Sequence, residues 1–262
     1  MLSNIKLIIE YKGKNYCGWQ SQGFSRLTNK TKKPIQQLVE NALAKILGEK
    51  IRLYGSGRTD SQVNALGQVA NFRTKSKLEP ERIKLALNTL LPRTIRVIKA
   101  EKVPLDFHSR FSARGKFYRY IILNQRATSA IFDDYCYLVK FPLNIALMRK
   151  AAEYLRGRHN FKAFCSSGSN SNNTIRTIYK ITISTPKKIF LNEISRYRFI
   201  CIDIHGDGFL YNMVRNIVGT LIEIGRGRYS PDYILKLFKE KNRQLCGPCV
   251  PAKGLYLCKV EY

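Results

Sequence analysis

The first half of the chain alternates between segments with the apolar pattern of strands and segments with the apolar spacing of helices. Apolar side chains within residues 35–47 and 80–90 recur every three or four positions, which predicts two amphipathic helices. Gly48 and Pro92 follow these segments at places typical of a helix end. Four further segments have the composition of strands: 5–11, 51–54, 68–73 and 94–103. The predicted order of elements is therefore βαββαβ.

The second half repeats this order with one additional helix. Its predicted helices cover 143–156, 209–224 and a segment from 230, and its predicted strands cover 116–123, 177–184, 197–205 and 255–261. A βαββαβ order is typical of a split-βαβ unit, an antiparallel sheet with helices on one face, as in ferredoxin-like and RRM domains. We therefore expect an α+β protein with two such halves, residues 1–105 and 106–262.

The charge of the chain is strongly positive and evenly spread. The 262 residues include 46 Lys and Arg against 18 Asp and Glu, a formal net charge of +28. Residues 1–105 hold 20 basic and 7 acidic side chains, and residues 106–262 hold 26 and 11, so the excess is not a basic tail. Such charge favours a polyanionic partner, nucleic acid ahead of an anionic membrane surface. A bias toward lysine without any function is the plain alternative.

Other compositional features narrow the class of protein. The chain has no apolar stretch of about 18 residues, and its first residues lack the apolar core of a signal peptide. We therefore expect a cytoplasmic protein without a membrane span. The three histidines, His108, His159 and His205, form no metal-binding spacing, so no metal site is expected. Seven cysteines in such a chain do not indicate a disulfide framework.

The segment from Gly55 to Asp60 is the first candidate for chemistry. It reads Gly-Ser-Gly-Arg-Thr-Asp and lies between two predicted strands that a short turn could join. Its two glycines permit a tight backbone path, and a cation, a hydroxyl and a carboxylate follow directly. The plain interpretation is a turn capped by the Asp60 side chain, which a segment of this kind often forms.

Further blocks along the chain agree in order with one known family. Together they resemble the tRNA pseudouridine synthases of the TruA family and cover nearly the whole chain. The blocks are Tyr11 to Gln20, Gly57 to Phe72, Phe107 to Ala113 with Tyr118-Arg119-Tyr120, Arg176-Thr177-Ile178, Gly208 to Leu221, and Ala252 to Leu257.

The resemblance implies a role for five residues. Asp60 matches the catalytic aspartate, which acts at the sugar C1′ or assists glycosidic cleavage of a flipped uridine. Arg215 matches the basic partner that keeps this carboxylate ionised, and Tyr118 matches the active-site tyrosine that stacks on the base. Leu255 matches an apolar residue of the uracil pocket, and Arg58 matches the arginine that helps to extrude the base or fills its place.

The resemblance also implies a fold, a substrate and an assembly. The implied fold is that of pseudouridine synthases, with the two antiparallel sheets meeting at a central cleft. The implied reaction converts uridine to pseudouridine in the anticodon stem-loop of tRNA without cofactor or metal. The implied assembly is a homodimer in which one tRNA reaches across both subunits.

Four positions depart from the family pattern, among them Ser61, which stands where the family has Ala. Gln62 and Asn64 stand where the family has Gly and His after the aspartate, and Lys12 replaces an acidic residue. Gln62 adds a side chain where we expect the turn to require a positive φ. Since none of these positions holds the carboxylate, we expect activity to be kept and the fit of the RNA to be altered.

Two competing functions rest on other features. Two RRM-like halves rich in aromatic residues are consistent with a non-catalytic RNA-binding protein, although neither half has an RNP1-type run. The Cys246-Gly247-Pro248-Cys249 motif is of the thioredoxin type, but it precedes a strand instead of opening a helix. We expect it to be an inert loop, with redox or adventitious metal chemistry as alternatives. Residues 20–33 and 165–174 read as polar surface loops or as RNA-contacting flaps.

Overall fold

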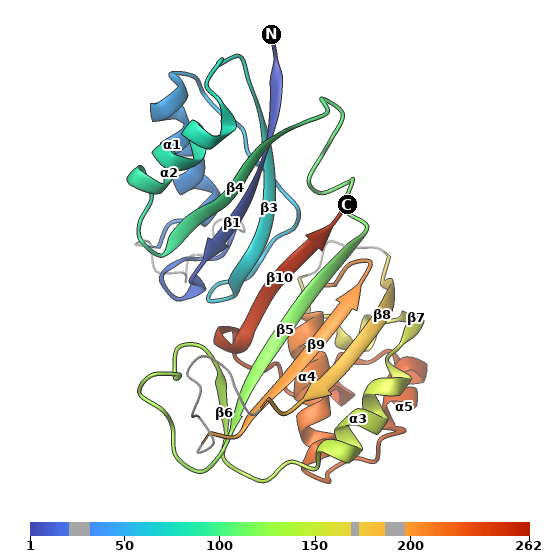
Figure 1. Cartoon of the computed structure of the whole chain (residues 1–262). Helices are drawn as coiled ribbons and strands as arrows, with labels where there is room; N and C mark the ends of the chain where they lie inside the picture. The colour runs from blue at the N-terminus through green and yellow to red at the C-terminus, as the bar shows by residue number, and fades with distance from the viewer. Residues whose placement is uncertain (21–31, 169–172, 187–196) are drawn as a thin grey trace. The chain divides into compact units, whose positions relative to one another are not determined.

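A computed structural model describes residues 1–20, 32–168, 173–186 and 197–262, coloured along the chain in Figure 1. The central parts of both predicted polar loops, residues 21–31 and 169–172, lie outside the described residues. The chain divides into two compact units, residues 1–114 with 256–262, and residues 115–255.

The first unit is a sheet whose one face carries two helices (Figure 1). Its strands run in the order β4-β1-β3-β10. The strand β3 pairs with β10 and, farther along, also with the short strand β2. The helices predicted over 35–47 and 80–90 are confirmed with these bounds. The elements are β1 (Ser3–Tyr11), α1 (Ile35–Leu47), β2 (Tyr54–Gly55), β3 (Asn64–Thr74), α2 (Pro80–Leu90), β4 (Ile95–Val103) and β10 (Leu255–Glu261).

The strand β3 organises this unit, because both of its edges are used. Antiparallel pairing with β1 covers one edge over most of its length. The opposite edge pairs with β2 at Ala70 and Asn71 and with β10 at Asn64 and Ala65. The segment between β2 and β3, which contains Asp60, therefore leaves and rejoins the same strand pair.

The sequence predicted a boundary between the two halves at residues 105 and 106. In the structure the second unit begins at residue 115 and ends at residue 255. The Asn4 side chain donates hydrogen bonds to the carbonyl groups of Pro104 and Phe107, each at 2.9 Å, which holds the segment after β4 on the first unit. The last strand joins the same unit because Tyr256 and Leu257 pair in parallel with β3. Contacts between distant residues, which local patterns do not reveal, cause both differences.

The second unit has a sheet in the order β5-β9-β8-β7, with β6 parallel to β5. Two short strands, β6 and β7, were not expected from the sequence. The elements are β5 (Gly115–Asn124), β6 (Tyr137–Val139), α3 (Ile145–Tyr154), β7 (Gly157–Asn160), β8 (Ile175–Ser184), β9 (Phe199–Gly206), α4 (Met213–Gly225) and α5 (Tyr233–Glu240). Helices and antiparallel strands in both units make the chain α+β.

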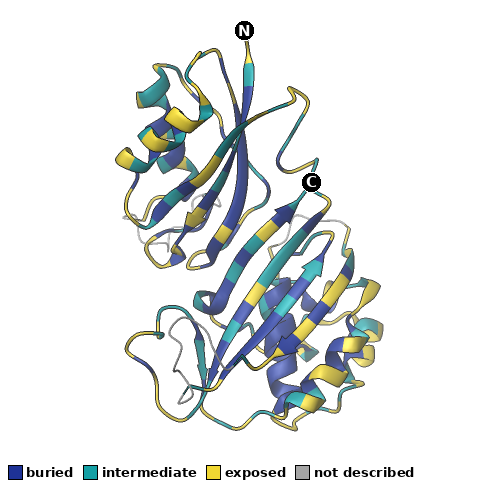
Figure 2. Ribbon diagram, viewed as in Figure 1, coloured by how far each residue is buried: buried dark blue, intermediate teal, exposed yellow. Residues whose placement is uncertain are grey.

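The helix α4 is the centre of the second unit's core. Nearly all of its residues are buried, as the dark blue ribbon in Figure 2 shows. The polar residues Asn216, Thr220 and Glu223 are buried together with its apolar residues, so other elements enclose the helix. The predicted start at 209 was too early, because Asn212 has a left-handed backbone with φ 58° and the helix begins after it.

Candidate active site

Two buried polar side chains, Ser56 and Gln68, hold the Gly55–Asp60 segment on β3. Ser56 donates from its hydroxyl to Oε1 of Gln68 at 2.6 Å, and Gln68 donates from its amide to the carbonyl of Gly57 at 3.1 Å. The backbone N–H of Ser56 also bonds to the carbonyl of Val69, at 2.7 Å. Because buried polar groups that find partners fix a unique geometry, the loop leaves the sheet along one defined path.

Thr59 anchors the next turn of this loop. Its hydroxyl shares a buried hydrogen bond of 2.7 Å with the hydroxyl of Tyr11 on β1. Its carbonyl accepts from the backbone N–H of Trp19 at 3.1 Å. Burial raises the pKa of Tyr11 well above its ordinary value, so this phenol stays neutral and available for the bond. Thr59 is buried, whereas Arg58 is exposed and Asp60 is half-buried.

Two glycines let the Tyr11–Gln20 segment approach the loop backbone closely. A Cβ on Gly18 would collide with the carbonyl oxygen of Thr59, and the φ of 103° at Gly18 also favours glycine. A Cβ on Gly13 would collide with the carbonyl oxygen of Val63. The first and second sequence blocks are therefore two halves of one packed structure around Asp60.

The turn after Asp60 contains two of the departures, Gln62 and Asn64, and shows what each residue does there. Gln62 has a φ of 68°, so the expectation of a positive φ at this position is confirmed. Asn64 is buried, and its Oδ1 accepts from the backbone N–H of Gly13 at 2.9 Å. The turn is closed by the N–H of Val63, which donates to the carbonyl of Asp60 at 3.2 Å. Asn64 thus has a structural role in joining the turn to the Tyr11–Gln20 segment.

Arg58 is the exposed cation of the loop. Its Nε donates to the side-chain oxygen of Gln20 at 2.8 Å, which links it to the end of the Tyr11–Gln20 segment. Arg58 and Asp60 flank a buried residue and come from one braced loop, so they lie on its more exposed side.

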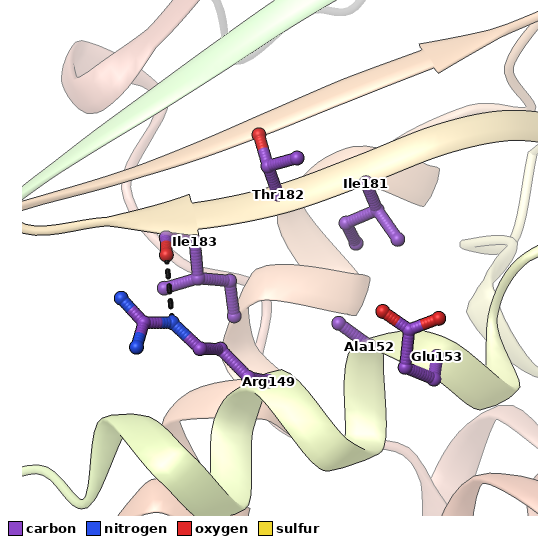
Figure 3. A pocket seen from close by; sticks show the side chains of 6 residues that line it. All are labelled: Arg149, Ala152, Glu153, Ile181, Thr182 and Ile183. Carbon is purple, nitrogen blue, oxygen red and sulfur yellow. Dashed lines mark hydrogen bonds between the residues drawn. The ribbon is translucent and has the colours of Figure 1, made fainter.

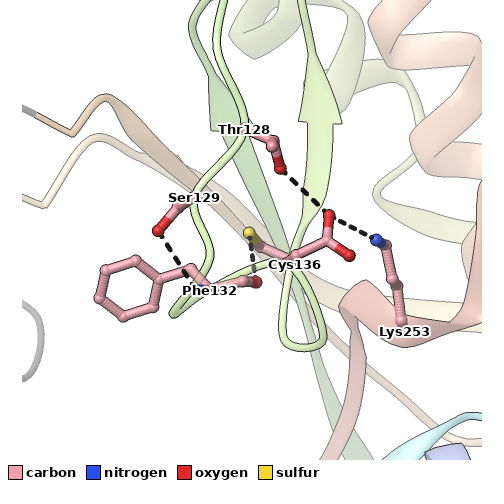
Figure 4. Close-up of polar contacts among 6 residues, drawn as sticks. Thr128, Ser129, Phe132, Cys136 and Lys253 are labelled. Atoms are coloured by element: carbon pink, nitrogen blue, oxygen red, sulfur yellow. Dashed lines mark hydrogen bonds and ion pairs between the residues drawn. The ribbon is translucent and has the colours of Figure 1, made fainter.

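The other three candidates belong to the second unit. Tyr118 lies on β5, half-buried, with its ring edge-on to Phe209 at a centroid distance of 5.2 Å. Leu255 is buried at the start of β10, directly after a 3-10 helix, η4 (Ala252–Gly254). Lys253 of this helix pairs with Asp133 at 3.1 Å, in the cluster of Figure 4.

Arg215 lies in the first turn of α4 and is held at two points. Its Nε donates to the carbonyl of Val250 at 2.7 Å, and its Nη1 donates to Oδ1 of Asn212 at 2.8 Å. Asn212 in turn donates to the hydroxyl of Ser166 at 3.2 Å. The guanidinium group therefore has a fixed orientation on the helix.

A second arginine, which the sequence did not single out, supports this arrangement. Arg243 in the 3-10 helix η3 (Arg243–Leu245) donates from Nη2 to Oδ1 of Asn216 at 2.8 Å and from Nη1 to the carbonyl of Gly247 at 3.1 Å. The Asn216 amide donates to the carbonyl of Phe164 at 2.7 Å. Arg243 thus ties the segment that leads to Val250 onto α4. A basic residue just before the Cys-Gly-Pro-Cys motif was the only signal in the sequence.

The Cys-Gly-Pro-Cys motif is packed as a structural segment. Cys246 is buried, and its sulfur lies 3.1 Å from the Thr220 hydroxyl on α4. Burial raises the pKa of the Cys246 thiol, which disfavours the thiolate that redox chemistry requires. Neither Cys246 nor Cys249 forms a disulfide bond, and no helix of the described chain starts at the motif.

The structure has a small pocket that none of the candidate residues lines. It lies between α3 and β8 and is lined by Arg149, Glu153 and Ile183 among others, and Nε of Arg149 donates to the carbonyl of Ile183 at 3.0 Å (Figure 3). Within the described ranges, no group of three or more His, Cys, Asp and Glu side chains is placed to hold a metal ion. No described helix has the length and hydropathy of a membrane span.

These observations define a basic α+β protein with a carboxylate held on a rigid loop. Arg58 and Asp60 lie in the first unit, and Tyr118, Arg215 and Leu255 in the second. The family model described as tRNA pseudouridine synthase matches residues 7–112 and 151–262. The chain belongs to this family, whose members are isomerases.

Curated relatives match along their whole length. Proteins named tRNA pseudouridine synthase A from Thermoanaerobacter sp. (strain X514) and Acetivibrio thermocellus are each 43% identical over 261 residues, which covers 100% of this chain and of theirs. The one from Clostridium botulinum (strain Alaska E43 / Type E3) is 44% identical with the same coverage. Membership of an enzyme family excludes a purely RNA-binding protein and a thiol oxidoreductase as the main function.

Among solved structures, similarity is slight. A chain of the archaeal box H/ACA sRNP Nop10-Cbf5 complex is 11% identical, covers 93% of this chain and 59% of its own, and has a TM-score of 0.36. A likeness of this size carries no argument about the function of the chain.

Proposed function

We propose that this protein converts uridine to pseudouridine in the anticodon stem-loop of tRNA, with Asp60 as the catalytic residue. The observation that carries the proposal is the bracing of Asp60. It follows directly on Thr59, whose hydroxyl and carbonyl are both bound, and it closes its own turn through the N–H of Val63. An aspartate whose backbone is held in this way, on a protein of charge +28, is suited to act on a polyanion.

The reaction is an isomerisation, so no atom is gained or lost overall. The bond from C1′ to N1 of the uridine breaks, the base turns, and a bond from C1′ to C5 forms. The proton of C5 leaves, and N1 gains one. The Asp60 carboxylate acts on this exchange either as a nucleophile at C1′ or by assisting cleavage of the glycosidic bond.

The other residues act on the same flipped nucleotide in this proposal. Arg58, exposed on the loop, occupies the place of the extruded base in the RNA. Tyr118 stacks on the uracil and takes part in proton transfer, and Leu255 forms an apolar wall. The Arg215 guanidinium favours the ionised form of Asp60. We further infer that each unit is a split-βαβ half, as in pseudouridine synthases.

Two substitutions test the role of Asp60. Asp60→Asn removes the charge and keeps the shape, and Asp60→Ala removes both. We expect both variants to bind tRNA like wild type and to form no pseudouridine, measured by chemical mapping of modified tRNA. Asp232→Asn is the matched control, because Asp232 is an exposed carboxylate whose side chain caps no helix N–H.

The outcomes separate the parts of the proposal. Full activity of Asp60→Asn contradicts the assignment of Asp60. Pseudouridine formed at tRNA positions outside the anticodon stem-loop contradicts the proposed substrate site.

We also infer a homodimer that contacts one tRNA with both subunits. Sedimentation of the protein with one equivalent of tRNA measures this, and a complex with a single subunit contradicts it.

A further inference from the structure

A row of aromatic rings with an arginine at each end lies on the first unit. The Tyr54 and His108 rings are 5.0 Å apart, and the His108 and Phe111 rings are 4.5 Å apart. The guanidinium of Arg52 lies 5.2 Å from the Tyr54 ring centre, and that of Arg110 lies 5.5 Å from the Phe111 ring centre. We call these five residues the aromatic row.

Phe111 is held in solvent by a well-braced turn. Its side chain is 76% exposed, the largest exposure of any described aromatic residue. Ser109, two residues before Phe111, is buried: its N–H donates to Oδ1 of Asn71 at 2.9 Å, and its hydroxyl donates to the carbonyl of Tyr54. Tyr262 donates to the Ser109 carbonyl at 2.8 Å. The exposure of Phe111 is therefore a property of the folded turn.

The ends of the turn are fixed as well. The N–H of His108 donates to the Ser112 hydroxyl at 3.1 Å, and the N–H of Ser112 donates to the carbonyl of His108 at 2.9 Å. Nδ1 of His108 accepts from the N–H of Arg110 at 3.1 Å, which sets the orientation of the imidazole. A large apolar ring that the fold holds out in water in this way forgoes the free energy of its own burial.

We propose that the aromatic row binds unpaired nucleotides of RNA that flank the uridine at Asp60. Aromatic faces stack on bases of any sequence, and arginines at the ends of such a row contact phosphates. The row continues into the catalytic loop, because Tyr54 begins β2 and the Gly55–Asp60 segment follows at once. The net charge of +28 and the two flanking guanidinium groups favour RNA over an apolar protein segment. The position beside Asp60 rests on the proposed function.

Substitutions of Phe111 separate stacking from simple apolar contact. Phe111→Ala is expected to weaken binding of tRNA and of a single-stranded oligonucleotide about fivefold to a hundredfold, the range of one lost base–aromatic stack. Phe111→Trp keeps a stacking face and is expected to bind like wild type. Phe111→Leu keeps apolar area without the face and is expected to resemble Phe111→Ala. Leu85→Ala is the matched control, since Leu85 on α2 is also exposed, at 58%.

Binding is measured by fluorescence anisotropy over a range of salt. Replacing Arg52 or Arg110 by Gln should reduce the slope of log affinity against log salt by about one each. If Phe111→Leu binds RNA like wild type, base stacking on the row is ruled out and the proposal is overturned. If Phe111→Ala changes only the sedimentation of the protein, the proposal is also overturned, and the row belongs to an interface between copies.

Activity is measured in parallel on the same variants. Weakened oligonucleotide binding by Phe111→Ala supports the aromatic row even if wild type forms no pseudouridine, which would contradict only the proposed function. If Phe111→Ala binds the oligonucleotide like wild type while wild type forms pseudouridine, the proposed role of the aromatic row is overturned and the proposed function stands.

Discussion

The hydroxyl groups of Tyr11 and Thr59 lie 2.7 Å apart, and both residues are buried. The two residues are 48 positions apart in the sequence. Thr59 directly precedes Asp60 in the chain. Tyr11 is the last residue of β1, so the bond fixes the loop to a strand in the middle of the first unit's sheet. The position of Asp60 is therefore set by the core of the unit.

Removal of this bond should lower both stability and activity. Tyr11→Phe leaves the Thr59 hydroxyl buried without this partner, which costs about 1–3 kcal/mol of the free energy of unfolding. We also expect turnover to fall, because the loop loses its anchor next to Asp60. Urea denaturation and pseudouridine assays measure the two effects. Tyr179→Phe on β8 is the control, since Tyr179 is exposed. Unchanged stability of Tyr11→Phe contradicts the importance of the bond.

Buried phenols and thiols make the fold sensitive to alkaline pH. Burial raises the pKa of Cys136 from 9.0 to about 12, and it also raises the pKa of Tyr11 and Tyr120. Since the folded-state pKa lies above the unfolded value, the stability that these groups contribute is complete below about pH 9. The contribution of Cys136 is then lost between pH 9 and 12, at about 1.4 kcal/mol per pH unit.

Paired denaturation experiments isolate the thiol. Wild type and Cys136→Ala are unfolded in urea at several values between pH 8 and 10, under reducing conditions. The difference in stability between them should shrink as the pH rises, because only wild type must keep a neutral thiol in its core. A constant difference over this range contradicts the raised pKa of Cys136.

Gln62, the residue with a positive φ in the turn after Asp60, offers a gain in stability. Gln62 has a φ of 68°, which costs a residue with a Cβ about 1 kcal/mol relative to glycine. Part of this is offset by the greater freedom of glycine in the unfolded chain. We expect Gln62→Gly to raise the free energy of unfolding by about 0.5 kcal/mol and to leave turnover unchanged. Lys241→Gly, at a φ of 52° in the second unit, is the matched control. A loss of stability would show that the Gln62 side chain makes contacts that outweigh the strain.

The strength of local signals decided which features the sequence could predict. The helices α1 and α2 were predicted with their observed bounds because their periodicity continues over more than ten residues. The strands β6 and β7 have three and four residues, too few for a pattern, and were missed. The positive φ at Gln62 was predictable because the family pattern that the sequence resembles has glycine at this position.

Long-range contacts were beyond such signals. The sequence pointed to Gly55–Asp60 through its glycines and its carboxylate, but the bond from Thr59 to Tyr11 joins segments with no local relation. The same is true of Arg243, whose partners Asn216 and Gly247 belong to α4 and to the segment after η3. Tertiary packing, which a single sequence does not display, selects these partners.

Arg243 is expected to affect catalysis through Arg215. Its hydrogen bonds to Asn216 and Gly247 hold the segment that ends at Val250, and the Val250 carbonyl orients the Arg215 guanidinium. Arg243→Ala frees this segment, so we expect kcat to fall about tenfold while KM for tRNA changes little. We also expect a loss of about 1–3 kcal/mol in stability, because the amide oxygen of Asn216 and the Gly247 carbonyl lose a charged donor.

The split between kcat and KM separates positioning from simple stabilisation. Arg243→Lys keeps a cation and one donor. Compared with Arg243→Ala, it should restore a larger share of the lost kcat than of the lost stability. Arg126→Ala, at an exposed arginine of the same unit, removes the same charge and should change neither parameter by more than about twofold. A folded Arg243→Ala protein with wild-type kcat would mean that Arg215 needs no support from this segment. A raised KM with unchanged kcat would instead place Arg243 on the RNA.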